Sequence, residues 1–89
     1  MVSAKVTNVR WAGLRCRITV TGQFNACQAD LRDRPADPAT SLVGTKAVNQ
    51  DGTVALVVAD DAREGSATTL VLLDAAGNVL DRLPVTVGG

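Results

Sequence analysis

The sequence predicts an all-β fold, a small antiparallel β-sandwich of six or seven strands with one short helical turn near residues 37–43. Two observations carry this prediction. Apolar and polar residues alternate along most of the chain, which is the pattern of half-buried strands. Turns rich in Gly, Asp and Asn separate these stretches at intervals of about 8–15 residues. With 89 residues the chain has room for a single domain, residues 1–89.

Two strands are predicted first, in "VSAKVTNVRW" and "LRCRITVT". In the second of these, Arg15 and Arg17 alternate with Cys16 and Ile18, so that one face is basic and the other apolar. In the first, the apolar positions change phase near residues 7–8. This change predicts a β-bulge at that point, or a strand that moves from one sheet to the other.

A third strand, "ACQADLRD", and a helical turn complete the first half. Cys27, Ala29 and Leu31 alternate with polar residues and are predicted to point inward. Asp37 followed by Pro38 is a typical helix start, because Asp caps free N–H groups and proline suits the first helical position.

Three further strands are predicted in "TVALVVA", "SATTLVLLD" and "NVLDRLPVTV". The first follows a turn at Asp51 and Gly52. The last follows "DAAGN", in which Gly77 can adopt the positive φ that a hairpin needs. Pro84 lacks an N–H donor, so the final strand is expected at a sheet edge or bulged there.

The two cysteines, Cys16 and Cys27, have two possible arrangements. If residues 21–22 formed a two-residue turn, the cysteines would lie opposite each other and could form a disulfide. A longer loop would set Cys16 against Leu31 and leave both thiols as small buried groups. The sequence shows no secretory signal, so we expect reduced thiols.

The composition argues against an enzyme. The chain has no His and no Tyr, so the commonest general base near neutral pH and a second class of acid are missing. The glycines form no phosphate-binding motif, and the acidic loop "DDAREG" contains Arg63 and lacks EF-hand spacing. We therefore expect no catalytic residues, no cofactor and no metal site.

The charges indicate which partners to expect. Nine basic and nine acidic residues cancel, which argues against a nucleic acid or a membrane surface as the partner. No apolar run reaches the roughly 18 residues of a membrane span. Residues 1–45 are net basic and residues 46–89 net acidic. The two halves would form an electrical dipole if they stayed apart in space, but not if they intermix around one core.

Several strands of the second half are apolar on both faces. Four side chains fall on the face opposite the main alternation: Val57, Val71, Leu73 and Leu80. Two interpretations are open. These residues belong to central strands of a chain rich in Val and Leu, or they form an outward patch that another subunit covers. The patch is the predicted protein interface, and with it we expect a homo-oligomer or an assembly-bound subunit.

Two family resemblances bear on function. The segment "NQDGTVALVV…EGSATTLVLLDAAGNVLDRLPVTV" resembles the closing strands of bacterial and phage immunoglobulin-like domains, with their "DGT" turn and "VTV" last strand. This resemblance implies an immunoglobulin-like sandwich that serves as a structural or adhesive module without catalytic residues. The opening hairpin and the terminal Gly88-Gly89 resemble β-grasp carriers of the ubiquitin type, but the middle of the chain lacks the apolar stripe of that family's helix.

The sequence thus predicts a non-catalytic structural or interaction module, most concretely a decoration or tail protein of a phage or bacterial assembly. One alternative is a β-grasp carrier activated at its C-terminal Gly-Gly, and another is a module of a secreted adhesin. Since no signal peptide is recognised, we expect synthesis in the cytoplasm and, for the first hypothesis, a place in the virion.

Overall fold

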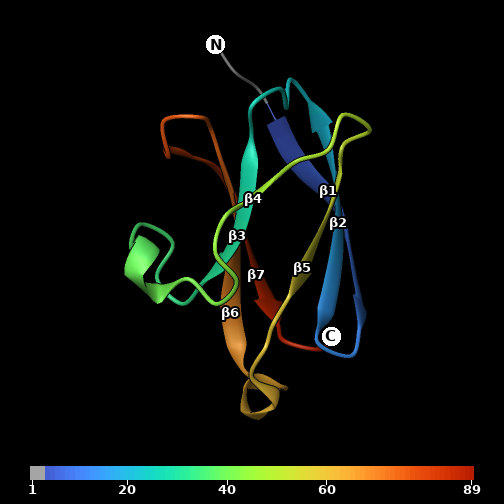
Figure 1. Cartoon of the computed structure of the whole chain (residues 1–89), viewed down its shortest axis with the longest axis vertical. Helices are drawn as coiled ribbons and strands as arrows, with labels where there is room; N and C mark the ends of the chain where they lie inside the picture. The colour runs from blue at the N-terminus through green and yellow to red at the C-terminus, as the bar shows by residue number, and fades with distance from the viewer. Residues whose placement is uncertain (1–3) are drawn as a thin grey trace.

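Two antiparallel sheets form the fold in a computed structural model that describes residues 4–89 (Figure 1). Val2, which the sequence analysis placed in the first strand, lies outside the described residues. The first sheet has the strand order β1-β2-β5 and the second the order β4-β3-β6-β7. The strands are β1 (Ala4–Ala12), β2 (Arg15–Gly22), β3 (Gln28–Arg32), β4 (Lys46–Ala47), β5 (Thr53–Val57), β6 (Ala67–Leu73) and β7 (Val79–Thr86). The described chain is therefore mostly antiparallel β in two sheets, as predicted.

The core lies between the two sheets and consists mainly of aliphatic side chains. The first sheet contributes Cys16, Ile18, Val20, Val54 and Leu56, and the second contributes Ala29, Leu31, Leu70 and Leu72. These residues alternate along their strands because successive side chains of a strand point to opposite faces. The predicted inward positions Cys27, Ala29 and Leu31 are all buried.

A β-bulge keeps β1 on the core. The pairing of β1 with β2 shifts between Val6 and Asn8, so Val9 and Trp11 pack against the same core as Val6. The phase change in the sequence is therefore a bulge. The N–H of Val6 donates to the carboxylate of Asp81 on β7, 3.0 Å away, which links the two sheets along this side.

The two halves of the chain intermix. β5 pairs with β2 in one sheet, and β3 pairs with β6 in the other. Gly22 and Ala26, with φ of 94° and 63°, lie in the turn that carries the chain from β2 across to β3. Because β2 and β3 belong to different sheets, Cys16 pairs with neither Cys27 nor Leu31 in a ladder, and both cysteines are free and buried.

Two short 3₁₀ turns lie in the loops, η1 (Pro38–Thr40) and η2 (Asp61–Arg63). The side chain of Asp37 accepts a hydrogen bond from the N–H of Ala39 at 2.9 Å, so the predicted cap is confirmed. η1 is shorter than the predicted segment, residues 37–43, and ends at Thr40. Asp60 caps η2 in the same way, a turn that the sequence analysis missed.

β7 is an edge strand, as Pro84 predicts. The turn before it contains Gly77 with φ of 89°, and Asp74 accepts hydrogen bonds there from the N–H groups of Ala76 and Asn78. The predicted positive φ at Gly77 is confirmed.

Candidate functional site

Four basic side chains share the outer face of the three-stranded sheet. Arg10 on β1 lies directly opposite Arg17 on β2, and Arg15 lies two residues before Arg17 on the same strand. Lys5 lies opposite Thr21 and belongs to the same face, because directly opposed residues point to one side of a sheet. All four are exposed. We call Lys5, Arg10, Arg15 and Arg17 the basic face.

A tight turn sets the register of the basic face. Gly13 and Leu14 join β1 to β2, with Ala12 opposite Arg15. Gly13 has a φ of 61°, which suits the first central position of a two-residue hairpin turn. This register brings Arg10 next to Arg17. The alternation of the sequence indicates the stripe of Arg15 and Arg17, whereas Arg10 joins it only through the register that the turn at Gly13 sets.

The charges of the basic face are not neutralised within its own sheet. On the same face, the third strand, β5, carries Thr53, Ala55 and Val57, which are uncharged. The ion pairs among residues 4–89 use other arginines and are Arg32–Asp30, Arg34–Asp37 and Arg63–Asp33. Outside the basic face, five basic residues remain against nine acidic ones. The molecule therefore has a positive face and a negative remainder, although its halves intermix.

One carboxylate, Asp51, lies at the end of β5. It accepts hydrogen bonds from the hydroxyl and the N–H of Thr53, at 2.7 and 3.0 Å. These bonds are the main cause of a lowered pKa of Asp51, and the positive charge of Arg17 contributes less. Asp51 therefore stays ionised at neutral pH and offsets part of the positive charge at this end only.

A shallow hollow of about 370 Å³ lies on the basic face and is lined by Arg10, Trp11, Ala12, Arg15 and Arg17. Guanidinium groups present planar pairs of N–H donors that match the two oxygens of a carboxylate.

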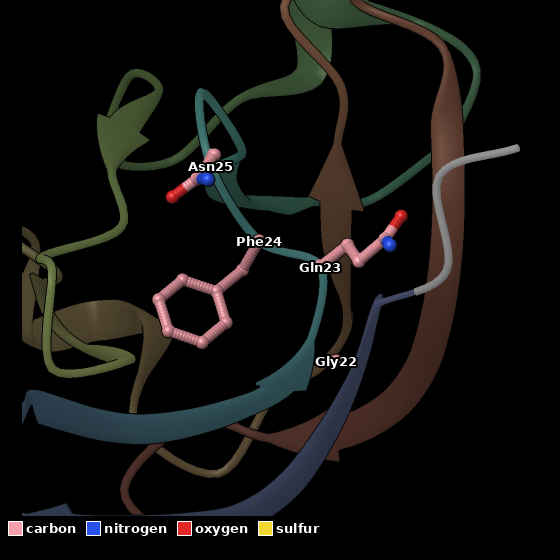
Figure 2. Close-up of a pocket in the computed structure, with 4 residues that line it drawn as sticks. All are labelled: Gly22, Gln23, Phe24 and Asn25. Carbon is pink, nitrogen blue, oxygen red and sulfur yellow. The ribbon is translucent and has the colours of Figure 1, made fainter.

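A second hollow of about 370 Å³ is lined by Gly22, Gln23, Phe24 and Asn25 (Figure 2). The side chains of Gln23 and Phe24 point to opposite sides of this loop, and the ring of Phe24 packs against the core. The lining contains no ionisable group. This hollow therefore brings no chemically active groups together.

The predicted interface is wrong as an outward patch. Val57 is 57% exposed, but Val71 and Leu73 are only 0% and 1% exposed. β6 is an inner strand of its sheet. On the face of this sheet that points away from the core, Val71 lies between Asp30 on β3 and Arg82 on β7. Neighbouring strands therefore flank both residues of β6, and the alternative of central strands holds for them.

Leu80 is also misplaced in the predicted patch. The pairing of β6 with β7 shifts between Leu72 and Leu73, so the side chain of Leu80 packs against the core. Val57 alone remains of the patch. It lies directly opposite Arg15 and therefore extends the basic face with an exposed apolar side chain.

Asp30 and Arg32 form a buried ion pair on the outer side of the second sheet. The Arg32 Nε donates to Asp30 at 2.9 Å, and the Ser41 hydroxyl donates to the same carboxylate at 2.7 Å. Arg32 also donates to the carbonyl of Pro35 at 3.1 Å. These bonds attach the loop that follows β3 to the sheet, so we assign the pair a structural role.

The two thiols are unsuited to nucleophilic chemistry. Burial raises the pKa of Cys16 to about 11. Burial also raises the pKa of Cys27, with a further contribution from the negative charge of Asp74. Both thiols are therefore protonated at neutral pH, whereas the reactive form is the thiolate.

The terminal glycines fold back onto the protein. The N–H of Gly89 donates to the carbonyl of Thr86 at 3.0 Å. Gly88 lies beside Glu64, and Gly89 lies beside Trp11. A conjugation tail must extend away from its domain to enter an activating enzyme, so this arrangement gives no support to the carrier alternative.

No group of three or more His, Cys, Asp or Glu side chains within residues 4–89 is placed to hold a metal ion. No helix in the same part of the chain is long and apolar enough to cross a membrane. No family model, curated protein or solved structure matches the chain. Among the described residues, the basic face is the candidate functional site.

Proposed function

We propose that this protein is a non-catalytic interaction module that binds an acidic surface of another protein through the basic face. The supporting observation is the set of exposed basic residues without an ion-pair partner in residues 4–89. Charge-assisted hydrogen bonds from arginine to carboxylates are among the strongest polar contacts between proteins. Complementary charge also speeds association and fixes the orientation of the partners.

The most concrete form of this proposal is an immunoglobulin-like accessory subunit, a decoration or tail protein of a phage or bacterial assembly. A chain of 89 residues buries only about 60–65% of its unfolded surface, so binding to a larger assembly would add to its stability. Because Val71 and Leu73 are buried and Leu80 packs against the core, the predicted homo-oligomer loses its apolar interface. An assembly-bound subunit is therefore the better proposal.

The two alternatives differ in how well the structure supports them. The β-grasp carrier needs a helix packed on its sheet, and the elements within residues 4–89 are strands and two 3₁₀ turns. A module of a secreted adhesin is compatible with the same basic face. The length of the gene distinguishes the adhesin from the accessory subunit.

The test is sedimentation of the tagged protein from cells of its own source. One variant carries Arg15→Glu and Arg17→Glu on the basic face. The matched control carries Lys46→Glu and Arg82→Glu, two exposed residues of the other sheet, and has the same net charge. We expect the wild type and the control to sediment with a particle far larger than 9.2 kDa and the basic-face variant to stay in the supernatant. The proposal is wrong if the wild type does not sediment, or if both variants sediment like it.

A further inference from the structure

The outer edge of β5 presents main-chain groups that are not hydrogen-bonded. Within residues 4–89, β5 lies at the margin of its sheet and forms a ladder with β2 alone, while β4 of the other sheet lies nearby without pairing to it (Figure 1). The N–H of Val58 donates to the carbonyl of Leu14 at 2.9 Å, and the N–H of Val20 donates to that of Gly52 at 2.7 Å. Hydrogen-bonded and non-bonded pairs alternate along an antiparallel ladder. The even-numbered residues of β5 therefore bond to β2, and the odd-numbered residues turn their N–H and C=O groups to the free edge.

Ala55 and Val57 are the open positions of this edge. The main-chain groups of Thr53 already have hydrogen-bond partners. Its N–H donates to Asp51 and its carbonyl accepts from the N–H of Asn49, both at 3.0 Å. The main-chain groups of Ala55 and Val57 have no partner within residues 4–89. The free edge thus offers two donors and two acceptors beside the exposed side chain of Val57.

The other edges in the described part of the chain are protected. β1 has its bulge and the bond from Val6 to Asp81. Next to β7, the N–H of Val87 donates to the carbonyl of Ser66 on the β6 side. Bonded and non-bonded pairs alternate along the ladder, so the nitrogen of Pro84, which carries no hydrogen, faces the free edge. β4 has only two residues. Bulges, proline and short strands are the usual means of preventing edge pairing, and the β5 edge has none of them.

We propose that an extended acidic segment of the partner protein adds to β5 as a further antiparallel strand. This inference rests on the proposed function and specifies how the partner binds. Ala55 lies directly opposite Arg17, and Val57 lies opposite Arg15, all on one face. A carboxylate on the added strand opposite Ala55 has only the small alanine side chain between it and Arg17. Main-chain bonds supply affinity in such complexes, and alternate side chains supply specificity.

A second copy of this chain fits the edge less well than an acidic segment. Two β5 strands paired edge to edge would place both basic faces side by side on one continuous sheet. Arg15 and Arg17 lie on β2, so this pairing would place two uncharged β5 strands between the two groups of arginines and would supply no carboxylate to either. An added strand with alternating carboxylates compensates the positive charge instead, which is why we choose the acidic segment.

The first experiment measures amide hydrogen exchange by NMR with a synthetic peptide. The probe is acetyl-Ser-Glu-Val-Glu-Val-Glu-Ser-amide, and the control peptide has Lys in place of each Glu. We expect the acidic peptide to slow exchange of the N–H groups of Ala55 and Val57 at least tenfold. The N–H groups of Val54 and Leu56 already bond to β2 and should change little. The lysine peptide should protect neither pair.

The second experiment removes the open donor. Ala55→Pro eliminates an N–H that faces the free edge and leaves the bonds to β2 in place, a position at which sheets accept proline. We expect at least a tenfold loss of affinity for the acidic peptide, whereas the matched control Ala55→Ser keeps the N–H and binds like the wild type. If Ala55→Pro does not fold, Val57→Pro tests the second open donor, and the exchange measurement needs no variant.

Failure of this inference is distinguishable from failure of the proposed function. If the peptide binds without protecting Ala55 and Val57, strand addition is wrong, while loss of sedimentation in the basic-face variant would still support the proposed function. Protection that rises with protein concentration without peptide would identify a second copy as the occupant and overturn the proposal. Equal binding of the lysine peptide, or no binding of either peptide up to about 1 mM, would overturn it as well.

Discussion

Replacing Asp30 with leucine is expected to remove a large part of the folding free energy of this domain. Asp30 is 0% exposed and accepts hydrogen bonds from the N–H of Leu31, the Nε of Arg32 and the hydroxyl of Ser41, at 2.8, 2.9 and 2.7 Å. Arg32 is itself only 5% exposed. After Asp30→Leu, the charge of Arg32 would stay buried, with the carbonyl of Pro35 as the remaining hydrogen-bond partner of Arg32.

The size of the effect follows from the burial of the charge. Removing one partner of a buried ion pair costs about 3–5 kcal/mol, because the other charge is left uncompensated. A domain of 89 residues has a total stability of about 4–13 kcal/mol. The double variant Asp30→Leu with Arg32→Met removes both charges and keeps the volume roughly constant. We expect it to be more stable than Asp30→Leu, because no uncompensated charge stays buried, although the N–H of Leu31 and the hydroxyl of Ser41 still lose their acceptor.

The assay is urea unfolding followed by the fluorescence of Trp11, the single tryptophan of the chain. Arg34→Met is the control, because Arg34 and Asp37 form an exposed ion pair whose loss should cost less than about 1 kcal/mol. Two results would refute the reasoning. One is a cost of less than about 1 kcal/mol for Asp30→Leu. The other is a double variant whose cost equals the sum of the two single variants.

Two further predictions concern a turn and a thiol. Gly52 has a φ of 86°, and an added Cβ would lie 2.6 Å from the carbonyl oxygen of Val20. Gly52→Ala should therefore lower the free energy of unfolding by at least about 1 kcal/mol more than Gly77→Ala does. Gly77 has nearly the same φ with open space around it, and equal urea midpoints would contradict the clash. Cys16→Ala should cost about 1–2 kcal/mol at pH 8, whether or not dithiothreitol is present. The pKa of Cys16 is raised from 9.0 to about 11, so the folded state holds its proton where the unfolded state has lost it. The stability of the wild type should therefore fall as the pH rises above 9, and this thiol should contribute up to about 1.4 kcal/mol per pH unit. An equally steep fall in Cys16→Ala would show that another group causes it.

Much of the local structure of this protein is visible in its sequence. Period-2 alternation placed the longer strands and their inward residues, such as Cys27 and Leu31. Turn chemistry placed the Asp37 cap and the positive φ of Gly77, and the missing N–H of Pro84 placed the last strand at an edge. These features depend on residues close together in the chain, so their physical causes are visible in a short segment.

The tertiary structure decided which strands pair and which faces are covered. The chain crosses between sheets after Gly22, so β2 pairs with β5 and the expected opposition of residues in β2 and β3 does not occur. Leu80 is the extra residue at the shift in the pairing of β6 with β7, and this break in the alternation places its side chain against the core. Val71 is buried on the outer side of β6, beside the buried Asp30 of the neighbouring strand, which the alternation of β6 alone does not indicate. The basic face and the open edge of β5 likewise exist only once β1, β2 and β5 lie side by side, and strand order depends on packing between segments far apart in the sequence.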